Sequence, residues 1–229
     1  MSPKLDHRGD QGILNKETAG IYFLYAYLFH QAPHRNLLLT IINERLLTKS
    51  RDFRSQCVGS FDAILEDPQW LHQEEKTAVE FASLFVIPGC EIIVPYESYY
   101  CDTLTIDYAT ACSAYFQSQA GSVSLKGFLG GCAAQSVRNR YKESGFEIDP
   151  AFFDLPDHVS AELEFMGKLY ALGDCAQAEN FYCEHLGRWI HLFLNKILQQ
   201  TGSYFYRAVA ESLKGFLREE KASVNNGEG

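Results

Sequence analysis

An acidic residue and an imidazole lie side by side at Asp157-His158, between Pro156 and a segment of strong helical periodicity. Such a pair can perform acid–base chemistry, bind a metal or recognise a cationic ligand. Asp157 can also simply cap the following helix, because its carboxylate accepts hydrogen bonds from the free N–H groups of a first turn. Local sequence favours this cap. It would leave His158 facing solvent in the first turn, where a cation is mildly unfavourable.

Catalysis or metal binding is the competing interpretation of the same pair. Two ligands on one helix face lie three or four residues apart, whereas Asp157 and His158 are adjacent and His185 and His191 are six apart. The chain contains no G-x-S-x-G elbow, phosphate loop or dinucleotide fingerprint. We therefore predict no metal and no cofactor. The alternative kept open is a small metal-dependent all-helical hydrolase that uses Asp157, His158 and distant histidines.

Charge and hydropathy restrict the classes of partner. The 229 residues carry a formal charge of −9, and Lys and Arg are scattered along the sequence, so nucleic acid is not expected and a cationic partner is favoured. No segment has the ~20 uninterrupted apolar residues of a membrane span, and the first residues lack the apolar core of a secretion signal. We expect a cytoplasmic protein without stable membrane insertion. The seven cysteines have irregular spacing and no Cys-x-x-Cys pair, and most are expected to be buried.

Helical periodicity dominates the chain and predicts an all-α fold, a single globular domain of about eight to ten helices. The only strand-like segment is Glu91-Ile92-Ile93-Val94. The helices are expected at residues 18–31, 36–47, 51–65, 73–86, 107–119, 125–144, 157–172, 176–200 and 203–219.

The domain boundaries follow from composition. Residues 16–220 form the predicted helical domain, and residues 1–15 are expected to be a flexible N-terminus. Residues 221–229 lack large apolar side chains and are expected to be disordered. Two prolines in residues 147–156 mark a candidate hinge, so the chain could be a monomer or a domain-swapped dimer.

A second histidine, His185, lies on an apolar helical stripe. Phe181, His185 and Trp189 are spaced at i, i+4 and i+8, which puts all three on one face. A histidine in such surroundings is expected to be buried and hydrogen-bonded rather than to act as a ligand or a base.

Four pieces of the sequence, in their order and spacing, resemble the TorD/DmsD/NarJ family of chaperones for molybdenum-containing oxidoreductases. The resemblance covers roughly residues 18–216. The pieces are Phe81-x-x-Leu84-Phe85 with Pro88-Gly89 and Pro95-Tyr96-Glu97-Ser98-Tyr99-Tyr100; Tyr141-Lys142-Glu143-Ser144-Gly145-Phe146; Pro156-Asp157-His158 with Glu162-Leu163-Glu164-Phe165-Met166; and Phe181-x-x-x-His185-Leu186-x-x-Trp189 before Phe193.

The resemblance implies a TorD-like helical fold, no catalytic activity, and binding of a twin-arginine signal peptide. The partner would be the catalytic subunit of a molybdopterin oxidoreductase, held in its apo form until the cofactor is inserted and the enzyme is exported. An acidic protein with carboxylates beside aromatic side chains complements an arginine pair followed by an apolar stretch.

Carried over by motif, the expected signal-peptide-binding residues fall into two groups. Asp157 and His158 would make polar contacts with the peptide. A second wall comes from the other motifs, and its apolar part includes Phe85 and Tyr96. The members of this wall are Phe81, Leu84, Phe85, Tyr96, Glu97 and Ser98, and Glu162 is also among the expected signal-peptide-binding residues.

Overall fold

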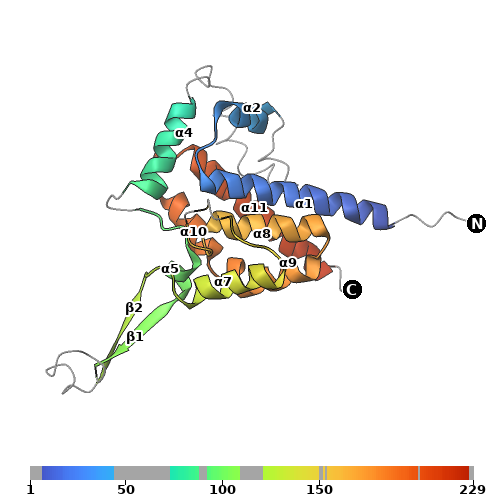
Figure 1. Cartoon of the computed structure of the whole chain (residues 1–229). Coiled ribbons are helices and arrows are strands. Elements are labelled where there is room, and N and C mark those ends of the chain that lie inside the picture. The colour runs from blue at the N-terminus through green and yellow to red at the C-terminus, as the bar shows by residue number, and fades with distance from the viewer. Residues whose placement is uncertain are drawn as a thin grey trace, which may run out of the picture.

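The computed structural model describes residues 7–43, 73–87, 92–108, 121–149, 152, 154–200 and 202–226. The predicted all-α class is confirmed, because helices form nearly all of the regular structure in these ranges (Figure 1). The helices are α1 (His7–His30), α2 (Arg35–Asn43), α4 (Gln73–Phe81), α5 (Glu97–Cys101), α7 (Cys132–Glu143), α8 (Val159–Leu172), α9 (Cys175–Phe181), α10 (Gly187–Gln199) and α11 (Phe205–Asn226), with π-helical turns η4 (Ala82–Val86) and η6 (Tyr182–Leu186).

Helix α8 is the centre of the fold. It lies alongside α1, and α9 and η6 also contact it (Figure 1). Because neighbours cover α8 on several sides, Val159, Leu163, Phe165 and Met166 are all buried although they do not lie on one narrow stripe. The α1–α8 contact is close at Gly167, where an added Cβ would lie 2.8 Å from the Phe23 ring and 3.2 Å from the Ala19 carbonyl oxygen.

Aromatic rings join α1, α10, α11 and η4 in one part of the core. Phe29 packs edge-on against Phe85 and Phe193, and Tyr206 meets Phe85 in the same way. The Tyr206 hydroxyl donates to the carbonyl of Leu28, 3.1 Å away, so this buried phenol is satisfied. The aromatic residues of the predicted helix over residues 73–86 therefore belong to the core, as their spacing indicates.

A β-hairpin replaces part of two helices that the sequence predicts. Strands β1 (Thr103–Asp107) and β2 (Ser122–Lys126) pair antiparallel, and α7 begins only at Cys132 instead of residue 125. Apolar and polar residues alternate in Thr-Leu-Thr-Ile and Ser-Val-Ser-Leu, which is the period of a strand. Gly127 and Gly130, with φ of +79° and +75°, stop any continuous helix there.

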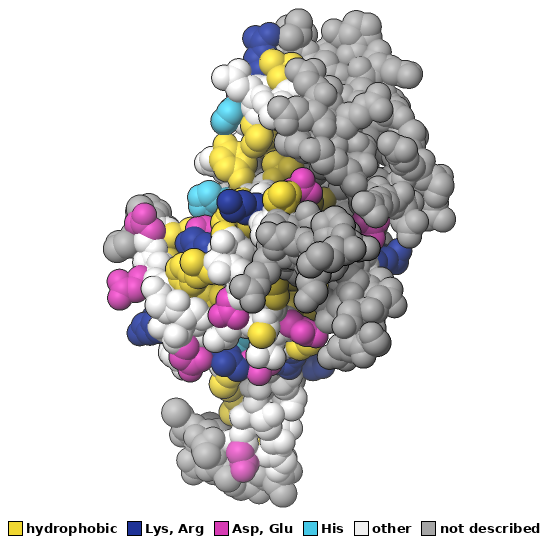
Figure 2. Space-filling model, turned by 90° about the vertical axis from the view of Figure 1, so that its right-hand side faces the viewer, with side chains coloured by type: hydrophobic (Ala, Val, Ile, Leu, Met, Phe, Trp, Pro, Cys, Tyr) yellow, Lys and Arg dark blue, Asp and Glu magenta, His cyan; other side chains and the backbone are white. Residues whose placement is uncertain are grey.

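The hairpin projects from the helical body and carries few charged side chains (Figure 2). All ten of its strand residues are exposed. Conversely, the segment predicted to be strand-like is irregular at Ile92–Val94, and only Ile92 of these three is exposed. Lys and Arg side chains are scattered over the face shown in Figure 2, as the sequence indicates.

Several boundaries and burial predictions also differ from the structure. Helix α1 begins at His7, inside the segment expected to be flexible, and α11 continues to Asn226, past the predicted start of a disordered tail. The helix predicted at residues 51–65 lies outside the described residues. Of the four described cysteines, Cys132 and Cys183 are exposed and the other two are half-buried, so the expected burial is wrong for these four.

A glycine pair tests the close packing of α1 on α8. Gly167→Val should lower the free energy of unfolding by roughly 2 kcal/mol, because the branched side chain collides with α1. Gly20→Val is the matched control: nothing lies within 4 Å of a Cβ at this exposed helical position, so stability should change by about 0.5 kcal/mol or less. Urea unfolding followed by circular dichroism measures both. Equal effects at the two positions would contradict the packing.

Candidate functional site

Helices α5 and α8 begin at one short antiparallel bridge between Tyr96 and His158. The first N–H of α5, from Glu97, donates to the carbonyl of Asp157 at 3.0 Å. The first N–H of α8, from Val159, donates to the carbonyl of Pro95 at 2.8 Å. Each segment therefore satisfies a free donor at the start of the other helix.

The carboxylate of Asp157 caps α5, not its own helix. Its Oδ2 accepts a hydrogen bond from the Ser98 N–H at 2.8 Å, and the side chain is fully buried. The predicted cap of α8 by Asp157 is therefore wrong. The reason is a turn closed by the His158 N–H and the Leu155 carbonyl, 3.1 Å apart, which leaves Asp157 inside the turn and delays the helix start.

His158 is the residue that caps α8. Its Nδ1 accepts from the Ser160 N–H at 3.1 Å and lies 2.7 Å from the Ser160 hydroxyl. The expectation that His158 faces solvent is wrong, since only 6% of its surface is exposed. Burial is the main reason that the pKa of His158 falls from 6.5 to about 4. A neutral imidazole can accept at a helix N-terminus without the penalty that a cation would meet.

Two further carboxyl groups are buried beside Asp157. Glu97 Oε2 lies 2.9 Å from His185 Nδ1, and the Trp189 indole N–H donates to Glu162 Oε2 at 3.1 Å. The pKa of Glu162 is raised well above its ordinary value, first by burial and then by the charge of Glu97. Burial and the neighbouring carboxylate both disfavour the charged form of Glu162.

His185 is buried and hydrogen-bonded, as its helical stripe predicts. Glu97 accepts a hydrogen bond from Nδ1 of His185, and the other ring nitrogen, Nε2, lies 3.3 Å from the Ser136 hydroxyl. The serine, histidine and carboxylate are thus linked in the order that a hydrolase triad has. They line a pocket of about 380 Å³ with Asp102 and Arg188. Ser136 lies inside α7, however, so the backbone N–H groups around it belong to the helix and do not form an oxyanion hole.

The arrangement of Asp157 and His158 gives little support to the hydrolase alternative. Asp157 bonds the backbone of α5 and His158 bonds Ser160, so the two adjacent side chains do not face a common ligand. Across the described ranges, no group of three or more His, Cys, Asp or Glu residues is arranged to hold a metal ion.

The expected apolar wall divides between two places. Phe81, Leu84 and Phe85 belong to the aromatic core, where the Phe85 ring lies against Phe29 and Tyr206. Tyr96 alone lies beside His158, with ring centroids 5.1 Å apart, and its hydroxyl donates to Asp154 at 2.7 Å.

The polar residues of the predicted site lie apart from the aromatic core that contains Phe81, Leu84 and Phe85. Glu97, Ser98, Asp157 and Glu162 lie together and have almost no exposed surface. The motifs thus identify a buried polar cluster. We call Glu97, Ser98, Asp157, His158, Glu162 and His185 the polar cluster.

Two further acidic residues, which sequence reasoning missed, cap a helix that is distant in the sequence, as Asp157 does. Glu80 accepts from the N–H groups of Tyr204, Phe205 and Tyr206 and so caps the start of α11. Asp102 accepts from the Ala133 N–H at 3.0 Å at the start of α7. The sequence signal was weak, because each carboxylate lies at least 30 residues from the helix that it caps.

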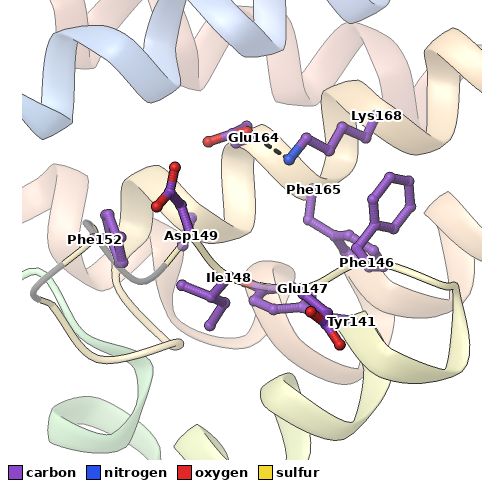
Figure 3. A pocket seen from close by; sticks show the side chains of 10 residues that line it. Tyr141, Phe146, Glu147, Ile148, Asp149, Phe152, Glu164, Phe165 and Lys168 are labelled. Atoms are coloured by element: carbon purple, nitrogen blue, oxygen red, sulfur yellow. Dashed lines mark ion pairs between the residues drawn. The ribbon is translucent and has the colours of Figure 1, made fainter.

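A surface pocket lies next to the polar cluster, between α8, the end of α7 and the segment that follows α7 (Figure 3). Its volume is about 320 Å³. Figure 3 shows carboxylates and aromatic rings around the same space. The lining residues are Tyr141, Phe146, Glu147, Ile148, Asp149, Phe152, Ala161, Glu164, Phe165 and Lys168.

Comparison with known proteins identifies the family. The model of the nitrate reductase delta subunit family matches residues 54–195, more than half of the chain. The chain belongs to this family. The chaperone protein TorD of Vibrio cholerae serotype O1 is 23% identical over 232 residues, which cover 91% of this chain and 92% of the relative.

The crystal structure of an Archaeoglobus fulgidus protein assigned to redox enzyme maturation superposes with a TM-score of 0.53 at 17% identity. It covers 88% of this chain and 93% of the other, and it supports the fold. The predicted resemblance to the TorD/DmsD/NarJ group is thereby confirmed.

A pair of capping aspartates tests the buried role of Asp157 in this family member. Asp157→Ala should lower the free energy of unfolding by roughly 2–3 kcal/mol, because it leaves the buried Ser98 N–H without an acceptor. Asp174→Ala is the control: Asp174 caps α9 in water, 3.2 Å from the Gln177 N–H, and its loss should cost about 1 kcal/mol or less. Chemical denaturation compares them, and an equal or smaller loss at Asp157 would contradict the role.

His158 makes the protein sensitive to acid. Unfolded chains bind a proton at this histidine below about pH 6.5, whereas the folded protein resists protonation down to about pH 4. Stability from this site is therefore lost as the pH falls from 6.5 to 4. His158→Asn keeps a capping side chain that does not titrate, so wild type should lose on the order of 3 kcal/mol more than the variant across this range. Denaturant midpoints at five pH values measure the difference, and parallel curves would refute it.

Proposed function

We propose that the protein is a cytoplasmic maturation chaperone for a redox enzyme, namely the catalytic subunit of a molybdopterin oxidoreductase. It binds the twin-arginine leader and the apo form of this client, and assists cofactor insertion before export. The observation that carries the proposal is the family match together with the TorD relative, which aligns along nearly the full length of both chains. The name of the TorD relative, a chaperone protein, favours a binding protein over an enzyme.

Physical properties of the chain support a cationic client segment. The formal charge of −9 favours association with arginine side chains, and it disfavours nucleic acid. None of the described helices is long and apolar enough to cross a membrane. The surface beside the polar cluster combines carboxylates with aromatic rings, which suits a guanidinium group.

The polar cluster contributes to binding by holding the surface around it. Asp157, Glu97 and Glu162 are fully buried, so their contribution to recognition is indirect. We expect their substitution to alter peptide affinity together with stability. Of the remaining predicted residues, Tyr96 is partly accessible and can contact the client directly.

Residues 147–156 precede α8 and would act as the hinge of a domain-swapped dimer. In such a dimer, α8 and the helices after it would pack on α1 of a second copy. Light scattering across a concentration series distinguishes this dimer from the monomer.

Binding of the leader tests the proposed function. A synthetic peptide with an arginine pair followed by an apolar stretch, taken from the leader of a molybdopterin oxidoreductase of the same organism, should bind the full-length protein in calorimetry. Raising the salt from about 50 to 500 mM should weaken binding several-fold by screening the charge attraction. The control peptide carries citrulline, which is uncharged, at both arginine positions. Absence of binding to every client leader tried, or equal binding of the citrulline peptide, would reject the proposal.

A further inference from the structure

Two neighbouring pockets lie along α8 and share two lining residues. The pocket of Figure 3, of about 320 Å³, is adjacent to a second pocket of about 260 Å³ between α8 and α1. Phe152 and Glu164 line both of them, so they mark the boundary. We call the combined surface the α8 groove. The second pocket is lined by Phe23, Ala26, Tyr27, His30, Phe152, Ser160 and Glu164.

The two ends of the groove differ in chemistry. The first pocket has the rings of Phe146 and Phe165 in its lining, together with three carboxylates, Glu147, Asp149 and Glu164. Lys168 is the one cation among the described residues that line this pocket. The second pocket has Phe23, 38% exposed, and two further aromatic rings, and its titratable groups are Tyr27, His30 and Glu164. One end therefore suits a cation and the other an apolar side chain.

Lys168 shows that the first pocket accommodates a cation. Its Nζ lies 2.6 Å from Glu164 Oε1 and 5.5 Å from the centre of the Phe146 ring. This is the combination of carboxylate and aromatic face that also favours a guanidinium group. Figure 3 shows the Lys168 ammonium directed at Glu164, beside the open space of the pocket. Because both side chains of the ion pair are partly exposed, exchanging the lysine for another cation costs little.

The groove also connects to the polar cluster. The Phe152 ring lies 6.1 Å from the His158 ring and stacks on His30 at 5.5 Å. Ser160, which lines the second pocket, bonds His158 Nδ1. His158, the buried residue that caps α8, thus holds Phe152 and Ser160 of the groove lining in position.

We propose that the α8 groove is the place where the client leader binds, which rests on the proposed function. An arginine of the leader enters the first pocket, displaces Lys168 from Glu164 and lies on an aromatic ring. The apolar residues that follow enter the second pocket against Phe23 and Tyr27. Lys168 is therefore a competitor built into the chain, and removing it strengthens binding.

Two variants with opposite expected effects test the groove. Glu164→Gln removes the carboxylate that pairs with the guanidinium and should weaken leader binding roughly threefold to tenfold. Lys168→Met keeps the aliphatic stem but removes the competing ammonium, so affinity should rise roughly threefold. Glu75→Gln is the matched control, because it removes the same charge at an exposed position of α4 away from the groove. Calorimetry with the arginine and citrulline peptides is run on all four proteins, with melting temperatures as a check on folding.

The outcomes separate the groove from the function. If wild type binds the arginine peptide and the two groove variants shift affinity in opposite directions while Glu75→Gln does not, the assignment holds. Should wild type bind the peptide while both groove variants match the control, the groove is overturned and the chaperone function stands. If wild type binds no client leader, the proposed function fails and the groove assignment fails with it. Loss of affinity in Lys168→Met would also overturn the groove assignment.

Discussion

The structure depends on one bridge of two backbone hydrogen bonds, between Glu97 N–H and Asp157 and between Val159 N–H and Pro95. This bridge begins α5 and α8 together, and α8 is the helix against which α1, α9 and η6 pack. A helix start leaves N–H donors unpaired, and burying them without acceptors would be costly. Here each chain segment supplies an acceptor for the other. Ser98 and Asp157, which are 59 residues apart in the sequence, are thereby held in a fixed position relative to each other.

Carboxylates that cap helices from distant parts of the chain extend this principle. Asp157 serves α5, Asp102 serves α7 and Glu80 serves α11. A local cap stabilises only its own helix, whereas a distant cap also fixes where the helix lies relative to the rest of the molecule. Such caps act as tertiary contacts, and their net contribution depends on the exclusion of water. The polar cluster combines this role with the burial of Glu162 and His185.

Sequence patterns predicted the helical class and much of the core, because burial imposes a period of 3.6 residues that is visible along residues 187–199. They failed at the hairpin, where a two-residue period in Thr103–Ile106 was short and lay between helical patterns. They also misplaced the cap of α8. Asp157 and His158 are both able to cap, and the choice depends on a turn and on an acceptor for Ser98 that only the folded chain brings into place. The motifs marked polar residues that lie together at the start of α5 and α8, but not that these residues are buried or that Phe81, Leu84 and Phe85 lie apart from them in the aromatic core.

Burial of the polar cluster limits how this protein can recognise charge. Glu162 has a raised pKa, so stability from its protonated form is lost as the pH rises above the ordinary value of 4.5. His158 has a lowered pKa, so stability from its neutral form is lost as the pH falls below 6.5. Burial thus disfavours the charged form of both groups in the folded protein, so neither adds much attraction for an arginine at the surface. The negative charge available to a cationic peptide lies outside the cluster, on exposed carboxylates such as Glu147 and Glu164. In the proposed function, the proline, acid and histidine of the turn would therefore act on binding through the shape that they give to this surface.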